Sequence, residues 1–554
     1  MSSTKVDTEG YSTKTSGQLS TVWLDDNKAP SFQPLSTNID VDVCVVGGGI
    51  AGITTAYLLQ KEGKKVALLE DGELCSGETG RTTAHLMGWY DDNYHLIKKK
   101  HGTKGAALIA QATLQAIDLI EDISKTENIN CNFQRVDGYY FLTPEDAQND
   151  PTKIDEEFKA SQEAGYPVKI VANSPIKSYH TGPSIVFEKS AQFDPLKYLF
   201  GVAQVFAKNG GQIYTMTRGT EFNGGEGAHV KTEKGHIVKC GHIVVCTNSP
   251  VNAGFSTHNF QEPYRSYVVC GEIDKDVVPQ AMFWDSDDPY HYARLQYLNK
   301  DLKQGEKNIL IIGGEDHRVG VQHHDQEYIE QRYTELEKWA RERWPEMGKI
   351  TSKWSGQVQE PCDGLPLIGR APADKENVLY ISGDSGQGMT TCSFGAMLIR
   401  DMILQRNNPL QDLLHPGRAM LSAPEELIKH NLGTFKEYLQ WLSRSDVADV
   451  EDILPDHGAV MRRDGEFTKV ACYRDCDGCL HEFSAVCTHL GGIVAWNESE
   501  KSFDCGCHGS RFDKYGKVVM GPANKDLSPI NDNAKKAQQA CGHSGQVKIH
   551  DAKL

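Results

Sequence analysis

The sequence lacks any long run of apolar residues. No stretch of about 18 apolar residues, the length that crosses a bilayer as a helix, occurs among its 554 residues. The first residues, Met1 to Asp7, also lack the apolar core of a secretory signal. We therefore expect a soluble protein without a membrane partner, cytoplasmic unless a targeting signal directs it elsewhere.

Basic charge is also scarce. Lys and Arg number 58 against 75 Asp and Glu, so the formal net charge at pH 7 is -17. Such a charge repels phosphate backbones, which disfavours nucleic acid as a partner. In an intracellular chain of this size, 15 cysteines indicate buried apolar residues or metal ligands before disulfides.

Composition and periodicity divide the chain into four parts. Residues 1–38 are rich in Ser, Thr, Asp and Lys and are expected to form an irregular arm over the surface. Residues 39–405 alternate helical and β patterns, 406–445 form a helical linker, and 446–554 contain short β runs between Gly and Asp turns. The predicted fold is a mixed α/β body followed by a small all-β domain.

The α/β body begins with a dinucleotide-binding pattern. A β run at residues 41–46 leads into a G-x-G-x-x-G motif, a helical stretch and a second β run that ends at Glu70. Gly47 permits the tight turn, Gly49 lets the backbone approach a pyrophosphate, and Gly52 lets the helix pack closely on the strand. Glu70 is predicted to bind a ribose hydroxyl pair. A glycine turn without a ligand is the alternative, which the complete βαβ context disfavours.

Two further segments, with this βαβ unit, resemble the D-amino-acid oxidase and glycine oxidase superfamily of FAD-dependent oxidoreductases. They are residues 77–85 (GETGRTTAH) and residues 377–389 (NVLYISGDSGQGM). The resemblance implies bound FAD and a Rossmann-like FAD-binding domain with an interleaved α+β substrate domain. It implies that the diphosphate is lined by Arg81, Thr82 and Thr83 and the isoalloxazine by Gly386, Gly388 and Met389. No second G-x-G-x-x-G unit of comparable quality occurs, so a dedicated NAD(P)H site is not expected.

Near the end of the chain, two Cys/His boxes match those of a Rieske domain. They are Cys487-Thr488-His489 and Cys505-Gly506-Cys507-His508, with 15 residues between His489 and Cys505. The resemblance implies that Cys487 and Cys505 bind one iron of a [2Fe-2S] cluster, while His489 and His508 bind the other. A zinc ribbon is the alternative, because zinc sites also use pairs of Cys and His.

Two positions depart from the fullest Rieske pattern. Gly492 stands where many members have a second cysteine, so Cys507 is predicted to be a free buried thiol. Phe512 replaces the tyrosine donor of high-potential members, while Ser510 keeps the hydroxyl that donates to a cluster sulfur. We therefore expect a midpoint potential in the lower part of the range of about -150 to +300 mV.

The whole architecture resembles a group of FAD-dependent oxidoreductases with a C-terminal Rieske domain. The matching segments are residues 80–86, 313–317, 354–357 and 363–369. The resemblance implies oxidation of a C–N bond in a small amine or amino acid, with electrons passing from FAD to the cluster and on to an external acceptor or oxygen. Two alternatives stay open: a reductase or monooxygenase component in which the cluster takes electrons from a donor protein and feeds the flavin, and a redox sensor.

Two residues of one predicted β run are the candidates for substrate binding. Arg294 and Tyr292 fall on one face of a predicted β run and are the candidate catalytic-site residues, with Arg294 expected to bind a substrate carboxylate. An ordinary salt-bridging arginine is the alternative.

The last residues, Ala552-Lys553-Leu554, are a conservative variant of the Ser-Lys-Leu signal and predict a peroxisomal import receptor as partner and a peroxisomal location.

Overall fold

The computed structural model describes residues 14–530, apart from residues 91, 253–257, 275, 297–306, 321–325, 373, 419–423 and 464–467. Within these ranges, none of the helices combines the length and the apolar character needed to cross a membrane. The tripeptide Ala552-Lys553-Leu554 lies outside the described residues, so peroxisomal import and its receptor stay predictions.

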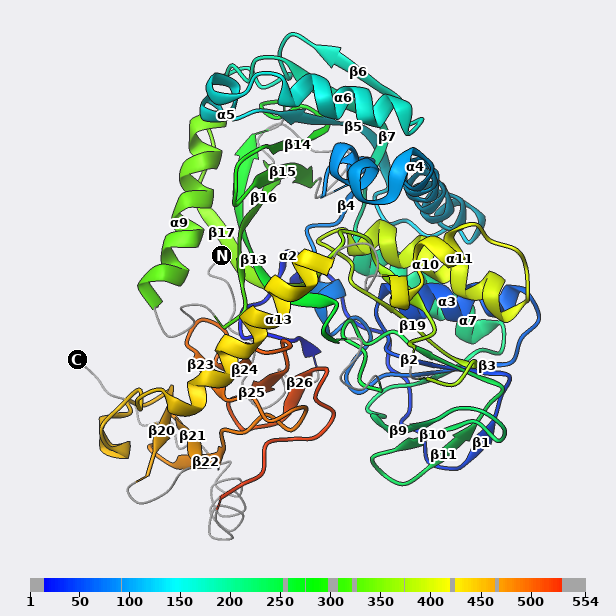
Figure 1. Ribbon diagram of the computed structural model, residues 1–554, viewed down its shortest axis with the longest axis vertical. Helices are drawn as coiled ribbons and strands as arrows, with labels where there is room; N and C mark the ends of the chain where they lie inside the picture. Colours follow the sequence, from blue (N-terminus) through cyan, green and yellow to red (C-terminus); the bar gives the residue numbers. More distant parts are fainter. Residues whose placement is uncertain are drawn as a thin grey trace.

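A mostly parallel sheet is built on the predicted βαβ unit (Figure 1). Its strands run in the order β18, β19, β12, β2, β3 and β8, and β18 pairs antiparallel with β19. The bounds are β2 (Val43–Val46), α3 (Ile50–Lys61), β3 (Val66–Leu69), β8 (Gln212–Tyr214), β12 (His242–Val245), β18 (Leu367–Gly369) and β19 (Val378–Ser382).

Every residue of β2 is buried because this sheet is covered on both faces. Val43 and Val45 belong to the core that includes α3, α7 (Pro195–Lys208) and α10 (Gly388–Ile403). Cys44 and Val46 point the other way, into the core shared with a small sheet. Its strands are β1 (Ile39–Asp40), β11 (Ile237–Lys239), β10 (His229–Thr232) and β9 (Gly219–Asn223).

A large mixed sheet forms the second part of the α/β body (Figure 1). Its order is β17 (Ile350–Pro361), β13 (Gln261–Asp274), β16 (Lys307–Arg318), β15 (His291–Gln296), β14 (Ala281–Asp285), β5 (Gln134–Phe141), β7 (Ser184–Gln192) and β4 (His85–Leu86), with β6 (Val168–Val171) beside β7. Helix α9 (Gln326–Arg343) covers one face through Ile329, Tyr333 and Leu336. Further described helices of the body include α4 (Tyr94–Thr126), α5 (Pro144–Asn149), α6 (Lys153–Glu163) and α11 (Leu410–Leu413).

The C-terminal domain consists of two small antiparallel sheets, which confirms the predicted all-β fold. One contains β20 (His457–Arg462), β21 (Lys469–Arg474) and β22 (Leu480–Ser484), and the other β23 (Val494–Asn497), β24 (Ser502–Cys505), β25 (Arg511–Asp513) and β26 (Val518–Met520). Helix α13 (Pro424–Tyr438) and the short helix η3 (Leu439–Leu442) lead into this domain and contact it.

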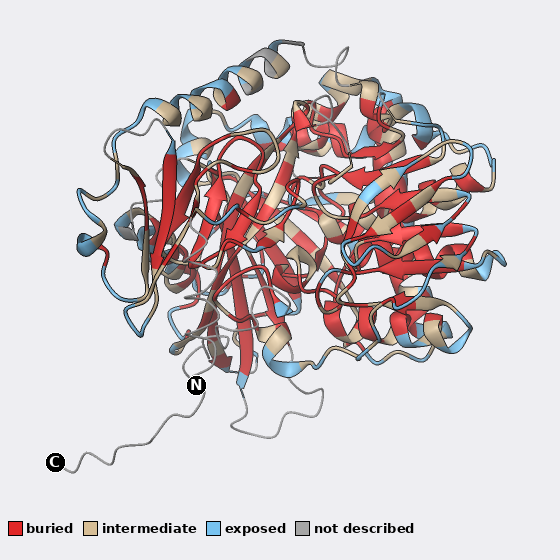
Figure 2. Ribbon diagram, turned by 90° about the horizontal axis from the view of Figure 1, so that it is seen from below, coloured by how far each residue is buried: buried red, intermediate tan, exposed pale blue. Residues whose placement is uncertain are grey.

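Part of the described N-terminal arm differs from the surface segment that the sequence predicts: residues 15–18, 20, 21 and 23 are buried, whereas residues 25–38 are exposed or half-buried apart from Leu35. Thr15 and Thr21 are 1% and 0% exposed, and helix α2 (Val22–Asp26) follows them. The segment of residues 15–21 packs at the joint between the two domains: the backbone N–H of Gln18 donates to Glu500 of the C-terminal domain, and Ser16 donates to Glu78 of the body. Figure 2 shows the continuous buried interior of the molecule, with exposed residues mainly on its outer helices and loops.

Candidate functional site

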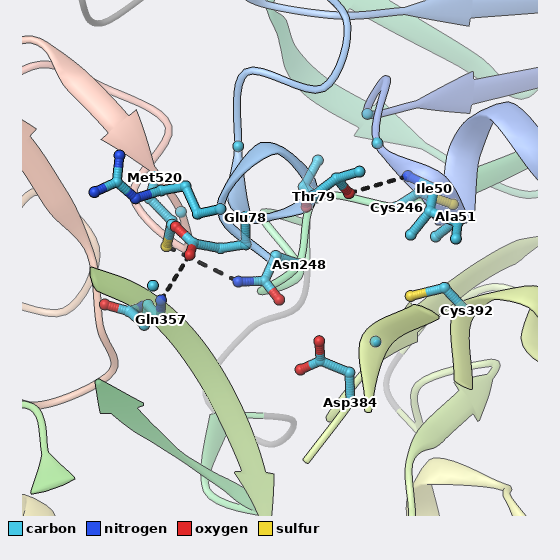
Figure 3. Close-up of a pocket in the computed structure, with 18 of the residues that line it drawn as sticks. Ile50, Ala51, Glu78, Thr79, Cys246, Asn248, Gln357, Asp384, Cys392 and Met520 are labelled. Carbon is cyan, nitrogen blue, oxygen red and sulfur yellow. Dashed lines mark hydrogen bonds between the residues drawn. The ribbon is translucent and has the colours of Figure 1, made fainter. Parts of the chain in front are cut away.

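One elongated cavity connects the glycine turn with the large sheet and the C-terminal domain (Figure 3). Its lining comes from the turn after β2, residues 76–83, the start of α10, the sheet strands β13, β15, β16 and β17, and residues 518–524. The cavity therefore collects groups from segments that are several hundred residues apart in the chain.

The glycine turn has the geometry that the motif predicts. Gly47 has φ +109°, and a Cβ there would lie 2.2 Å from the carbonyl oxygen of Cys246. A Cβ on Gly52 would lie 1.8 Å from the carbonyl oxygen of Gly47, so only glycine lets α3 pack against the turn. Gly49 precedes the first residue of α3, and Thr79 accepts a hydrogen bond from the N–H of Ile50 at 3.1 Å (Figure 3).

Replacing Gly52 by alanine is expected to remove most of the bound FAD, because the new methyl group would push α3 away from the turn. Overpacking of this kind costs about 1–3 kcal/mol, which corresponds to a loss of affinity of roughly 5- to 150-fold. The measurement is the flavin released per chain on denaturation.

Gly63→Ala is the matched control for this variant. Gly63 has φ +82° but no atom within 4 Å of its Cβ position, so alanine there should lower stability by about 1 kcal/mol and leave the flavin content unchanged. A Gly52→Ala protein with full flavin content would contradict the prediction.

Glu70 lines the same cavity as the glycine turn, and its binding of a ribose stays a prediction. Its carboxylate accepts hydrogen bonds from the N–H groups of Gly48 at 2.5 Å and Gly72 at 2.8 Å. Burial raises the pKa of Glu70 well above its usual value, and the neighbouring Asp71 adds to this. The carboxyl group is thus held rigidly against the glycine turn and lines the cavity.

The residues predicted to contact the diphosphate and the isoalloxazine meet in the same cavity. Thr82 and Thr83 line it together with Gly386, Gly388 and Met389. Helix α10 begins at Gly388, so its N-terminal N–H groups and its positive dipole end lie at the cavity, where they favour negative charge. Asp384, which the sequence did not single out, also lines the cavity, and burial raises its pKa to about 6.

Arg81 differs from the prediction in the direction of its side chain. Its backbone segment lines the cavity, but its guanidinium, 2% exposed, forms an ion pair with Glu500 at 2.8 Å. The same group donates to the backbone carbonyl of Ser355 at 2.5 Å and to the Leu19 carbonyl at 3.0 Å. The guanidinium therefore joins the two domains and the arm.

The four predicted cluster ligands come together at the tip of the C-terminal domain. Cys487 and His489 lie in the loop between β22 and β23, and the sulfurs of Cys487 and Cys505 are close enough to hydrogen bond. The rings of His489 and His508 are 5.1 Å apart between centroids. A Cβ on Gly492 would lie 3.0 Å from the Cys505 sulfur, so this glycine leaves room at the thiolates. The donor set and the space beside it fit a [2Fe-2S] cluster.

Cys507 is a free, buried cysteine, as predicted. A Cβ on Gly492 would lie 2.6 Å from its sulfur, so Gly492 occupies the position from which a second cysteine would bridge the loops. Ser510 hydrogen bonds to the sulfur of Cys487, while Phe512 is fully buried in the domain core. The lower potential expected from Phe512 stays a prediction.

Residues 520–523 contact the ligand region of the C-terminal domain and also form part of the cavity wall. Ala523 donates from its N–H to Ser510 at 3.0 Å, which ties the loop to the ligand region. Met520 and Gly521 of the same loop line the cavity, and Asn248 donates to the Met520 sulfur at 3.9 Å (Figure 3). This stretch of chain therefore contacts both the FAD cavity and the ligand region of the cluster.

His258 packs against both cluster histidines from the flavin-binding body. Its ring centroid lies 4.6 Å from that of His489 and 5.8 Å from that of His508, and its Nδ1 is 3.5 Å from the Ser249 hydroxyl. Gln357 donates to the carbonyl of Gly509 at 2.9 Å on the same face. Sequence reasoning missed His258 because no motif surrounds it.

The two predicted catalytic-site residues have different surroundings. Tyr292 lines the cavity and stacks with Tyr290 at 5.6 Å. Arg294 is fully buried and outside the cavity lining: it donates to the carbonyls of Ala84 at 2.7 Å and Phe193 at 3.1 Å and to the side chain of Gln296. Its guanidinium links strands of the large sheet and is not presented to a substrate.

A second cavity, of about 890 Å³, opens beside Tyr290 on the outer side of the large sheet. Tyr290 and Asp316 line both cavities, so they mark the junction between the FAD site and the outside. Burial raises the pKa of Asp316 to about 7. The sequence did not single out Asp316, because an acid in a β run gives no signal by itself.

Comparisons with known proteins agree with both sites. The sequence profile of the FAD dependent oxidoreductase family matches residues 42–402, and that of the Rieske [2Fe-2S] domain matches residues 443–531. The chain is 31% identical to the putative Rieske 2Fe-2S iron-sulfur protein YhfW of Bacillus subtilis, over 92% of this chain and 97% of that one. It is 23% identical to the γ-glutamylputrescine oxidoreductase of Escherichia coli, over 72% and 93% of the two chains.

Among solved structures, the L-proline dehydrogenase of P. horikoshii has the same fold over 70% of this chain and all of that one, with a TM-score of 0.57 and 20% identity. The fold and the two sites define a flavoprotein oxidoreductase with an iron–sulfur domain. The chain belongs to the FAD dependent oxidoreductase family and carries a C-terminal Rieske domain, so its cofactors are FAD and a [2Fe-2S] cluster. The Rieske match decides against the zinc ribbon.

Proposed function

We propose that the protein oxidises the C–N bond of an amine or amino acid at FAD and passes the electrons singly to the Rieske cluster, which delivers them to an external acceptor or to oxygen. The main support is the shared wall: residues 518–524 line the FAD cavity, and the same loop hydrogen bonds to Ser510 beside the cluster ligands.

When bound, FAD supplies a two-electron acceptor for a hydride, and the cluster supplies a one-electron carrier. The substrate carbon loses the hydride and its nitrogen loses a proton, which leaves an imine for hydrolysis. Of the residues here, Tyr290 and Tyr292 form the wall where the substrate would lie. The N-terminus of α10 favours the negative charge that develops across the cavity.

The relatives support an amine or amino acid as substrate without deciding between the two. One is named for γ-glutamylputrescine and one for L-proline. The absence of a second dinucleotide motif in the sequence favours electrons that enter from such a substrate and not from NAD(P)H.

Anaerobic mixing of the holoenzyme with a panel of amines and amino acids tests the proposal. We expect the flavin absorbance to fall first and the cluster signal, followed by electron paramagnetic resonance, to appear afterwards. Reduction by NAD(P)H with no response to any member of the panel would instead favour the reverse direction. A flavin that responds to neither would favour a sensor.

A further inference from the structure

Asp316 has an unsatisfied acceptor at the junction of the two cavities. Its Oδ1 atom is buried and has no hydrogen-bond partner, whereas Ser266 donates to the carboxyl group. Buried acceptors without a partner are uncommon because each costs about 1–3 kcal/mol. An oxygen of this kind at the boundary between a cofactor cavity and an outer cavity is suited to a ligand that donates hydrogen bonds.

Two aromatic residues share the cavity lining with this carboxyl group. Tyr290 lines both cavities with Asp316, and Tyr292 stacks on Tyr290 and has its hydroxyl 3.5 Å from the Ser266 hydroxyl. Aromatic faces attract cations, and a carboxylate pairs with an ammonium group. The junction therefore has both features that recognise an alkylammonium ion.

The guanidinium groups near the FAD cavity are already engaged by protein acceptors. Arg81 pairs with Glu500, and Arg294 donates to backbone carbonyls and Gln296. Arg218, the other arginine of the described FAD-cavity lining, lies 3.5 Å from Asp71 and 3.3 Å from Asp526. Among the described residues that line the FAD cavity, Asp316 thus has no guanidinium beside it that is not already paired with a protein acceptor, so a carboxylate on the reacting carbon would be repelled there.

The outer cavity contains charges of both signs. Its described acidic residues are Asp92, Glu262, Asp288 and Glu360, and its basic residues are Lys100, Arg318, Lys429 and Lys436. These groups can accommodate a polar tail of either sign. Discrimination between substrates with and without a carboxylate on the reacting carbon therefore depends on Asp316, Tyr290 and Tyr292.

We propose that the substrate is an amine whose reacting carbon carries no carboxylate, and that Asp316, flanked by Tyr290 and Tyr292, binds its ammonium group. This inference rests on the proposed function and names its substrate class. Asp316 is a binding residue here, and the amine proton is lost after binding.

Matched substrate pairs test the inference on the wild-type holoenzyme. Each α-amino acid is compared with the amine that lacks its carboxylate: proline with pyrrolidine, phenylalanine with phenethylamine, and ornithine with putrescine. In the pair that reduces the flavin fastest under anaerobic conditions, we expect the amine to be at least about 100-fold more efficient. A faster reaction with the amino acid would overturn the inference, whereas no reduction by any compound would count against the proposed function itself.

A variant separates binding from reaction. Asp316→Asn is expected to raise the apparent dissociation constant of the amine by about 100-fold, with a smaller change in the limiting rate of flavin reduction. The control is Asp274→Asn, which removes the same charge from a side chain that is 65% exposed at the end of β13 and should leave both values unchanged. An unaltered dissociation constant in Asp316→Asn would overturn the inference.

A binding titration that requires no catalytic turnover provides a third test. A tert-butylammonium ion keeps the N–H donors of a substrate amine but has no hydrogen on the carbon next to nitrogen, so it cannot be oxidised by hydride loss, and its binding is followed by the change in the flavin spectrum. Saturable binding to the wild type and a loss of about 100-fold in affinity in Asp316→Asn, at equal FAD content, are expected. If Asp316→Asn does not fold, the substrate pairs and the titration of the wild type still decide the matter, because a wild type that does not bind the ion contradicts the inference.

Discussion

Replacing Glu500 by glutamine is expected to lower the free energy of unfolding by about 3–5 kcal/mol, because it leaves a buried arginine without its counter-charge. Glu500 and Arg81 are both 0% exposed in their side chains and lie 2.8 Å apart across the joint between the domains. Glu500 also accepts hydrogen bonds from Ser355 and from the N–H of Gln18. The variant therefore loosens the body, the arm and the Rieske domain together.

Chemical denaturation measures the loss, and hydrogen exchange locates it. Exchange should accelerate in residues 15–21 and 500–511, where the ion pair holds the arm and the domain. Glu221→Gln is the control, since its partner Lys231 is 42% exposed and Glu221 itself 54%, and a surface pair of this kind contributes little. Equal stability of the two variants would contradict the assignment of Glu500 to the joint.

The effect of Glu500 depends on pH with a definite sign. Burial by itself raises the pKa of this carboxyl, but Arg81, Arg511 and Arg265 outweigh it and hold the pKa of Glu500 below its usual value of 4.5. A lowered pKa stabilises the fold above the unfolded-state pKa, and this contribution is lost as the pH falls through the folded-state pKa. The stability difference between the wild type and Glu500→Gln should be full at pH 7 and shrink below about pH 4.

Replacing Cys505 by alanine is expected to abolish the cluster while FAD remains bound. A reductive titration counts the electrons: the wild type should take up about three per chain, two at FAD and one at the cluster, and the variant about two. The Rieske electron paramagnetic resonance signal should disappear from the variant. Flavin reduction by substrate should persist, because the glycine turn and α10 lie in the other domain.

Cys507→Ala is the matched control for the cluster variant. Cys507 is a buried free thiol two residues from Cys505, with Gly492 opposite, and is not one of the predicted ligands. It should keep the cluster and take up about three electrons. Loss of the cluster from both variants alike would contradict the ligand assignment.

Both cofactor sites contain short local motifs, and these motifs made the sites predictable from the sequence. The glycines of residues 47–52 and the Cys/His boxes at 487–489 and 505–508 are short stretches whose residue types and spacing follow from the group they hold. The structure brings each set together in the expected place. The βαβ unit was predictable for the same reason, since β2 and β3 are buried runs joined by a helix of the expected spacing.

Residues whose partners are distant in sequence could not be placed in advance. Arg81 belongs to a cofactor-lining segment, yet its guanidinium pairs with Glu500, 419 residues away. Arg294 has the residue type that binds a carboxylate, but the backbone carbonyls of Ala84 and Phe193 occupy it. The acceptors to which an arginine side chain donates hydrogen bonds depend on how whole domains pack together.

The sequence alone determined the two cofactor sites, the α/β and all-β fold classes and the order of the domains, because these follow from contiguous motifs and periodicity. Only the tertiary structure decided that residues 518–524 of the Rieske domain line the FAD cavity, that residues 15–21 pack at the joint, and that Asp316 lines both cavities. These features arise where segments hundreds of residues apart pack together, and no local pattern specifies which surfaces will meet.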